Sequence, residues 1–168
     1  SCRSWLQPRP YVGVTSLILG TQIGKRGTAM EWAALIAWVV TAGGGFLLLV
    51  KWLRHGGMQQ REGGQIRPIL ILSHFALAAT GLVLWIVFVV SDSDALAWIA
   101  FALLVVVALL GWTMFAIWYQ RRQGQATTEP AAGSSVPAEQ SFPVAIVTLH
   151  GIAAVTTVVL VFLAAIGV

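Results

Sequence analysis

Four long apolar segments, separated by shorter polar ones, make up most of this chain. They run approximately over residues 31–53, 68–90, 95–119 and 142–166. Each reaches the roughly 20 apolar residues that an α-helix needs to cross the hydrocarbon core of a bilayer. The pattern therefore predicts an all-α integral membrane protein, a four-helix bundle within residues 30–168.

The overall composition supports a membrane environment. The chain is 58% hydrophobic and 10% charged, whereas soluble domains carry about 25% charged residues. The net charge of +4 comes from bases beside the apolar segments, which suits lipid headgroups, so we expect a lipid bilayer and no nucleic acid as partner. Cys2 is the single cysteine, which excludes an internal disulfide and a multi-thiolate metal site.

The first 29 residues differ from the rest, with four bases around a modest apolar run at 11–19. This resembles a signal peptide, but no convincing small-x-small cleavage site follows it. The alternative, which we favour, is that translation starts at Met30 and that residues 1–29 come from an upstream extension of the reading frame. We therefore expect residues 1–29 to lie outside the mature fold.

The three links between the apolar segments predict the orientation of the bundle. The link 54–67 is polar and glycine-rich, 91–94 is a tight acidic turn, and 120–141 has a composition typical of disorder. Bases flank only the first and third links, at Lys51, Arg54, Arg61, Arg67, Arg121 and Arg122. The positive-inside rule places links 54–67 and 120–141 in the cytoplasm, and we expect a prokaryotic cytoplasmic membrane.

The segments also repeat in pairs. The first and third align at an offset of 66, and the second and fourth at an offset of 76. The most informative matches are Trp32 with Trp98, Gly45 with Gly111, Trp52 with Trp118, and His74 with His150. We interpret this as two parallel helical-hairpin repeats about an axis along the membrane normal; chance similarity of apolar sequence is the alternative. The second and fourth helices then lie diagonally, and the tryptophans form a belt at each membrane surface.

His74 and His150 are the candidate functional residues, because a histidine inside hydrocarbon is costly without a partner. At 1.5 Å per residue, both lie about 10 Å from the cytoplasmic surface. Small residues at or near this depth leave room for a flat ligand; they are Gly43, Gly44, Gly45, Ala78 and Gly111. A haem ligated by both imidazoles would fill that space, with its propionates near cytoplasmic bases such as Arg67.

In this arrangement the chain resembles the membrane b-type cytochromes, four-helix proteins that hold haem between histidines on facing helices. The resemblance covers the pattern of spans over residues 31–168 and the two histidines. It implies haem b as cofactor, His74 and His150 as the iron ligands, and electron transfer with a quinone or a redox membrane complex. Many such proteins hold two haems on four histidines, whereas this chain has one intramembrane pair. We expect His55 to be a solvated loop residue.

Two other classes of function stay open. Glycines also let membrane helices pack closely, and a buried histidine can simply bond a carbonyl, so a haem-free accessory or assembly subunit, as a homo- or hetero-oligomer, is one alternative. A small transporter or channel is another. All six acidic residues lie in links or at a span end, which weakens ion-coupled transport. No third ligand for zinc lies at this depth.

Overall fold

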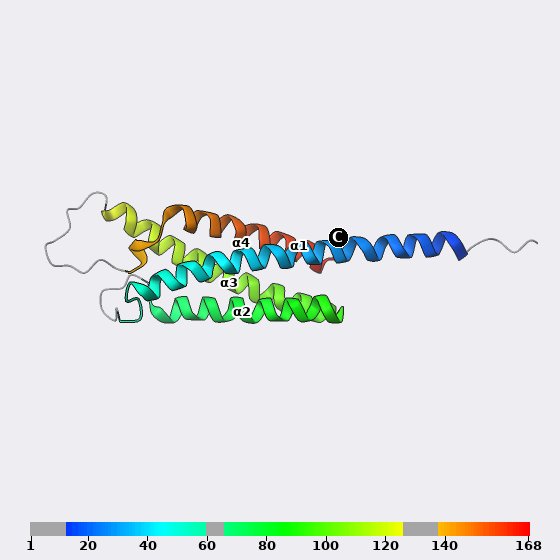
Figure 1. Ribbon diagram of the computed structural model, residues 1–168, viewed down its shortest axis with the longest axis horizontal. Helices are drawn as coiled ribbons and strands as arrows, with labels where there is room; N and C mark the ends of the chain where they lie inside the picture. Colours follow the sequence, from blue (N-terminus) through cyan, green and yellow to red (C-terminus); the bar gives the residue numbers. More distant parts are fainter. Residues whose placement is uncertain (1–12, 60–65, 126–137) are drawn as a thin grey trace, which may run out of the picture.

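The computed structural model describes the backbone of residues 13–59, 66–125 and 138–168, and the described part is helical without strands (Figure 1). The elements are α1 (Gly13–Arg54), α2 (Pro68–Ser91), α3 (Asp94–Gln125), the short 3-10 helix η1 (Ala138–Ser141) and α4 (Val144–Ala165). Four stretches are long and apolar enough to cross a membrane, at Ala29–Arg54, Pro68–Ser91, Asp94–Gly124 and Val144–Ala165. The prediction of an all-α four-helix bundle is confirmed.

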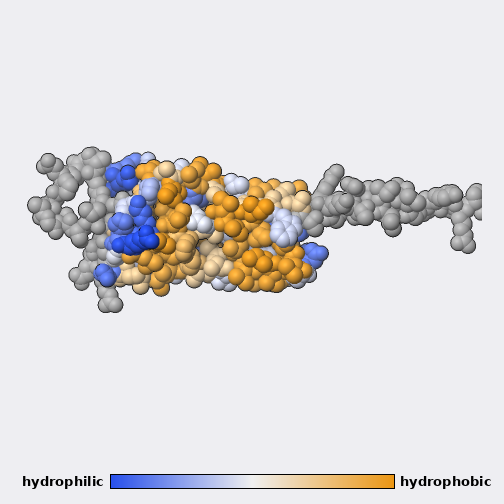
Figure 2. All heavy atoms as spheres, viewed as in Figure 1, coloured by the Kyte–Doolittle hydropathy of each residue, from blue (hydrophilic) through white to orange (hydrophobic). Residues whose placement is uncertain are grey.

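The outer surface of the bundle is apolar over most of its length. Large hydrophobic side chains such as Ile36, Val83 and Leu109 are about 60% exposed, and apolar residues cover the middle of the molecule (Figure 2). Because such a surface is stable against lipid and not against water, the protein is a multi-pass membrane protein. We call the end with Lys51, Arg54, Arg67, Arg121 and Arg122 the basic end, and the end with Glu31, Asp92 and Asp94 the acidic end.

The turn at the acidic end is as tight as its sequence predicts. Only Asp92 and Ser93 separate α2 from α3. Asp92 adopts the left-handed conformation (φ 54°), which aspartate tolerates better than most side chains. Its amide donates to the carbonyl of Phe88 at 2.8 Å and so ends α2. The turn therefore fixes α2 and α3 as an antiparallel pair.

The four helices form a ring in the order α1, α2, α3, α4. Helix α1 packs most extensively against α4, and α2 against α3, while the pairs α1–α2 and α3–α4 complete the ring. No backbone contact joins α2 to α4 within the described residues. The second and fourth helices thus lie diagonally, as we predicted, and side chains on them meet only across the bundle interior.

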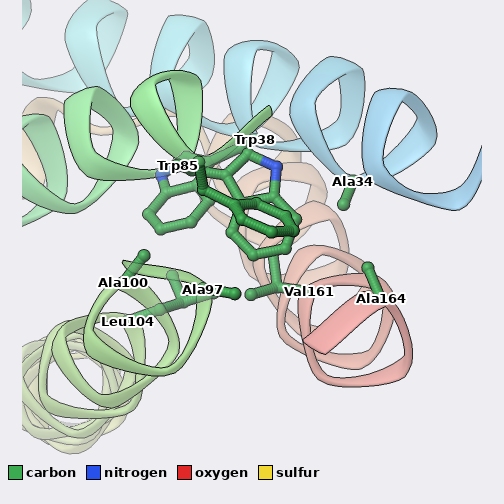
Figure 3. Close-up of a cluster of buried hydrophobic side chains, with 9 residues drawn as sticks. Ala34, Trp38, Trp85, Ala97, Ala100, Leu104, Val161 and Ala164 are labelled. Atoms are coloured by element: carbon green, nitrogen blue, oxygen red, sulfur yellow. The ribbon is translucent and has the colours of Figure 1, made fainter. Parts of the chain in front are cut away.

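A cluster of aromatic and small residues fills the interior near the acidic end (Figure 3). The rings of Trp38 and Trp85 are 6.3 Å apart, and Trp85 lies 4.8 Å from Phe88. Ala34 and Ala100 are fully buried beside them, since only small side chains leave room for two indoles. All four helices contribute to this cluster, which closes the centre of the bundle at this level.

The membrane-surface tryptophans follow the predicted belt at one end only. Trp32 and Trp98, toward the acidic end, are 53% and 45% exposed, as residues that face a lipid interface should be. Trp52 and Trp118, toward the basic end, are 1% and 6% exposed, so the prediction of a second belt was wrong. Trp52 is buried because its ring lies against the backbone of Gly57 in the turn that follows α1.

Two segments are more helical than the sequence indicated. Helix α3 continues to Gln125, and residues 138–141 form η1, so the link predicted to be disordered is ordered at both of its ends. The reason lies in packing: Glu139 of η1 is fully buried and its Oε1 accepts a hydrogen bond from the amide of Ile66 at 2.8 Å. Residues 126–137 lie outside the described residues.

Helix α1 begins at Gly13 and runs unbroken into the first span, so that it extends beyond the other helices (Figure 1). Residues 1–12 and the side chains of residues 13–28 lie outside the described part of the chain. That residues 1–29 are not part of the mature fold stays a prediction.

Candidate functional site

His150 lies at the interface between α4 and α1. A Cβ added at Gly45 of α1 would lie 3.0 Å from Cε1 of the imidazole, and one added at Gly44 would lie 3.4 Å from its Nδ1. The same Nδ1 is 3.0 Å from the carbonyl oxygen of Thr41. Because a carbonyl only accepts, Nδ1 must carry the proton when this bond forms, and Nε2 of the neutral ring keeps its lone pair.

His74 occupies the corresponding place between α2 and α3. A Cβ added at Gly111 of α3 would lie 3.2 Å from Cε1 of this imidazole. The ring faces the carbonyl of Val107, but its buried Nδ1 makes no hydrogen bond of normal geometry. The structure therefore places the two histidines that the sequence singled out in corresponding positions, each against a glycine of a neighbouring helix.

The two environments are related by the predicted repeat. With offsets of 66 and 76, Gly45 matches Gly111, Thr41 matches Val107, and His74 matches His150. Each histidine thus contacts a glycine of the other hairpin, α4 on α1 and α2 on α3. The repeat itself stays a prediction, but this exchange of contacts is what a two-fold axis through the bundle would produce.

The glycines serve the imidazoles more directly than we predicted. Gly44, Gly45 and Gly111 lie directly against the two rings. The histidine side chains therefore fill the space beside these glycines, which we had predicted to be an open slot. We call these close His–Gly contacts the histidine seats. Gly43 does not belong to it: a Cβ there would meet no atom within 4 Å, because this residue faces outward. Ala78 is half-buried one turn beyond His74 on α2.

Two threonines add a polar contact that the sequence analysis missed. Thr41 and Thr157 place their hydroxyl oxygens 2.9 Å apart across the α1–α4 interface. Each hydroxyl also lies within hydrogen-bond distance of a carbonyl four residues earlier, Ala37 for Thr41 and Ala153 for Thr157. Thr157 is fully buried. One sign of this role is present in the sequence: Thr157 carries a hydroxyl, whereas the matching residue of the other hairpin is Gly81.

No family model, no curated protein and no solved structure matches this chain. The resemblance to the b-type cytochromes therefore stays a prediction, and roles are assigned to residues from geometry and chemistry.

The candidate site contains two metal-ligating side chains and no more. Among the described residues, no three His, Cys, Asp or Glu side chains gather into a metal-binding group. A tetrahedral zinc site needs three or four protein ligands, so His74 and His150 do not form one by themselves. A haem iron, by contrast, takes its four equatorial ligands from the porphyrin and needs only axial ligands from the protein.

The basic end lies on the same side of the bundle as the histidines. Arg67 immediately precedes α2 and is exposed, seven residues before His74, which is about 10 Å along a helix. His55 is exposed, as predicted, and its Nδ1 is 2.8 Å from the carbonyl oxygen of Lys51. Glu139 was not predicted to matter, yet its bond to Ile66 connects η1 to the start of α2.

An apolar groove opens beside His150 on the outside of the bundle. It has a volume of about 230 Å³ and lies between α1 and α4. Its lining includes Val40, Gly44, Leu47, Leu149, His150 and Ala153. Val40, Leu47 and Leu149 are at least 60% exposed, so this groove, which we call the α1/α4 groove, faces the lipid.

Proposed function

We propose that this protein is a b-type haem protein that transfers electrons in a prokaryotic cytoplasmic membrane, with one haem b held between His74 and His150. The observation that carries the proposal is the pair of imidazoles on diagonal helices, each against a glycine of a neighbouring helix. Haem b bound there would supply a one-electron couple, and two protein ligands leave no open position for a substrate. The protein is then an electron-transfer component and not a stand-alone catalyst.

The hydrogen bonding of His150 suits the role of an iron ligand. Metal-ligating histidines usually donate their other ring N–H to a carbonyl or carboxylate, which fixes the tautomer and raises the basicity of the ligating nitrogen. The bond from Nδ1 of His150 to Thr41 does this and leaves Nε2 available. His74 faces the carbonyl of Val107 in the related position. Two imidazoles with such acceptors are the ligands that a bis-histidine haem would use.

The basic residues indicate how the bundle is oriented in the membrane and where the haem propionates would lie. The positive-inside rule places the basic end, with links 54–67 and 120–141, in the cytoplasm. Arg67 and Lys51 lie at that end and would neutralise haem propionates there. Electrons would then pass to or from a quinone or a redox membrane complex, in a homo- or hetero-oligomer where one is formed.

The structure weighs against a channel along the axis of the bundle. Trp38 and Trp85 are 2% and 0% exposed and lie against each other in the interior, so the axis is filled near the acidic end. A haem-free accessory or assembly subunit is the second candidate. The His150–Gly45 and His74–Gly111 contacts favour this second candidate, because a histidine ring packed against a glycine also holds two helices together without haem.

Visible spectroscopy of the full-length protein tests the proposal. The protein is expressed with added haem precursor, purified in detergent, and measured oxidised and dithionite-reduced. We expect a Soret band and a sharp reduced α band, both lost in His74→Ala and in His150→Ala. His55→Ala is the matched control, because this exposed histidine lies outside the bundle, and it should keep the spectrum.

The opposite results would separate the two candidates. A colourless wild-type protein with a helical circular dichroism spectrum would rule out haem and leave the accessory-subunit hypothesis. A spectrum that survives both intramembrane substitutions would show that haem binds elsewhere.

A further inference from the structure

Two of the residues that line the α1/α4 groove have small side chains, which leaves the space between the helices open. Gly44 on α1 and Ala153 on α4 both line it. At the matching positions of the other hairpin pair the chain has leucines, Leu110 on α3 and Leu77 on α2, and both are half-buried. The place that is open beside His150 therefore has large side chains beside His74. The two halves of the bundle therefore differ in side-chain size at these positions.

A strip of positive charge continues the groove toward the basic end. Lys51 and Arg54 follow Leu47 of the groove at spacings of four and seven residues, which places all three on one face of α1. Lys51 is half-buried and Arg54 is exposed. The matching residues on α3 are Ile117 and Gln120, which carry no charge. The groove and the bases in line with it thus occur together on α1, whereas the bases of α3 stand one and two residues beyond Gln120, at Arg121 and Arg122.

Among the described residues, one acidic residue, Glu139, lies on an element that contacts α1. Glu139 belongs to η1, which packs against α1, but its side chain is fully buried and its Oε1 bonds to the amide of Ile66. His55, one residue after Arg54, is exposed. Lys51 and Arg54 therefore place two positive charges in line with the groove at the basic end.

We propose that the α1/α4 groove binds one anionic phospholipid. Its phosphate lies between Lys51 and Arg54, and one of its acyl chains runs down the groove to His150. The groove faces the lipid, so phospholipids surround it at high concentration. An acyl chain matches its lining, in which His150 is the one polar residue among those described. Basic residues near the surface attract anionic headgroups, and a filled groove removes a packing defect from the α1–α4 interface.

This lipid contacts the Nδ1 side of the imidazole. Gly44, which lines the groove, lies nearest Nδ1 of His150, whereas Gly45 lies nearest Cε1. The acyl chain therefore covers the hydrogen bond from Nδ1 to Thr41. The proposal does not depend on haem, because it rests on the lining of the groove and on Lys51 and Arg54.

Native mass spectrometry of the full chain in detergent tests this site. The probes are phosphatidylglycerol and phosphatidylcholine with identical acyl chains, titrated separately. We expect phosphatidylglycerol to bind more tightly to the wild type. The double variant K51Q/R54Q should lose about fivefold in affinity for each base removed, down to the level of phosphatidylcholine. Ala153→Leu should weaken both lipids by about fivefold or more, because it displaces acyl methylenes from the groove.

Two controls make the result specific. Gly43→Leu adds the same side chain as Gly44→Leu to the outer surface of α1, one position away and with no neighbour within 4 Å. Arg121→Gln removes a base at the same end from α3. Both should bind phosphatidylglycerol like the wild type.

The proposal is overturned by any of three results. These are equal affinity for the two lipids in the wild type, wild-type affinity in a folded Ala153→Leu variant, and a loss in Arg121→Gln as large as that in K51Q/R54Q. Helical circular dichroism identifies the folded variants. Gly44→Leu serves as the second filling variant if Ala153→Leu does not fold.

Discussion

Nδ1 of His150 on α4 lies 3.0 Å from the carbonyl oxygen of Thr41 on α1. The hydroxyl of the same threonine lies 2.9 Å from that of Thr157, about two turns further along α4. A single residue of α1 therefore makes two polar contacts with α4. The α2–α3 interface has no such pair among the described residues, since its matching positions are Val107 and Gly81. Two halves that match in sequence thus differ in how they are held together.

The threonine pair predicts a difference between two adjacent substitutions. Thr157→Val removes the hydroxyl that meets Thr41, and we expect a loss of about 0.6 kcal/mol, up to about 1.7 kcal/mol, in the free energy of unfolding. Thr156→Val should change it little, because that exposed hydroxyl bonds only to the carbonyl of Ile152 in its own helix. Unfolding by SDS titration in mixed micelles, followed by circular dichroism, measures both. Equal effects would show that the inter-helix contact does not contribute.

The histidine seats predict an order among three glycine substitutions. Gly45→Ala and Gly111→Ala put a Cβ 3.0 Å and 3.2 Å from an imidazole carbon, so we expect each to destabilise the bundle by about 1–3 kcal/mol through overpacking. Gly43→Ala meets no atom within 4 Å and should be neutral or slightly stabilising. The measurement is the thermal unfolding temperature in detergent. If Gly43→Ala were the most harmful, the seats would be assigned to the wrong residues.

The burial of the tryptophans predicts which of them lipid can reach. Variants that each keep one tryptophan, with the others changed to phenylalanine, are reconstituted with brominated phospholipids, and quenching of fluorescence is measured. We expect strong quenching for Trp32, Trp98 and Trp112, which are 45–62% exposed. Weak quenching is expected for the buried indoles, Trp38, Trp52, Trp85 and Trp118. Strong quenching at Trp52 would restore the second belt that the sequence predicted.

The contact between η1 and the start of α2 predicts a local effect at the basic end. Glu139→Ala removes the oxygen that accepts from the amide of Ile66, so hydrogen exchange at that amide should accelerate by about tenfold, for a hydrogen bond worth about 1.5 kcal/mol. Glu139→Gln retains a carbonyl oxygen and should show a smaller change. Exchange at amides near the acidic end, such as that of Asp92, is the internal control and should not respond to either variant.

Local features of the sequence were enough to find the helices. The apolar spans 31–53, 68–90, 95–119 and 142–166 agree with the observed helices to within a few residues, except that α1 begins at Gly13 and α3 continues to Gln125. Span length and hydrophobicity are properties of a continuous stretch, and the acidic turn at Asp92 is set by its own backbone conformation. The matched depth of His74 and His150 also followed from counting residues along each helix.

Which residues touch was decided by the tertiary structure. In a membrane protein the sides of a helix that face lipid and the sides that face protein are both apolar, so periodicity says little about orientation. Gly43 and Gly44 are adjacent in the chain, yet one faces outward and the other contacts His150. The burial of Trp52 and of Glu139 likewise depends on segments distant in sequence. The sequence by itself determined the number, length and approximate depth of the helices, because transfer into a membrane depends on each segment alone. Only the packing of four helices determined the histidine seats and the groove, because those arise where two surfaces meet.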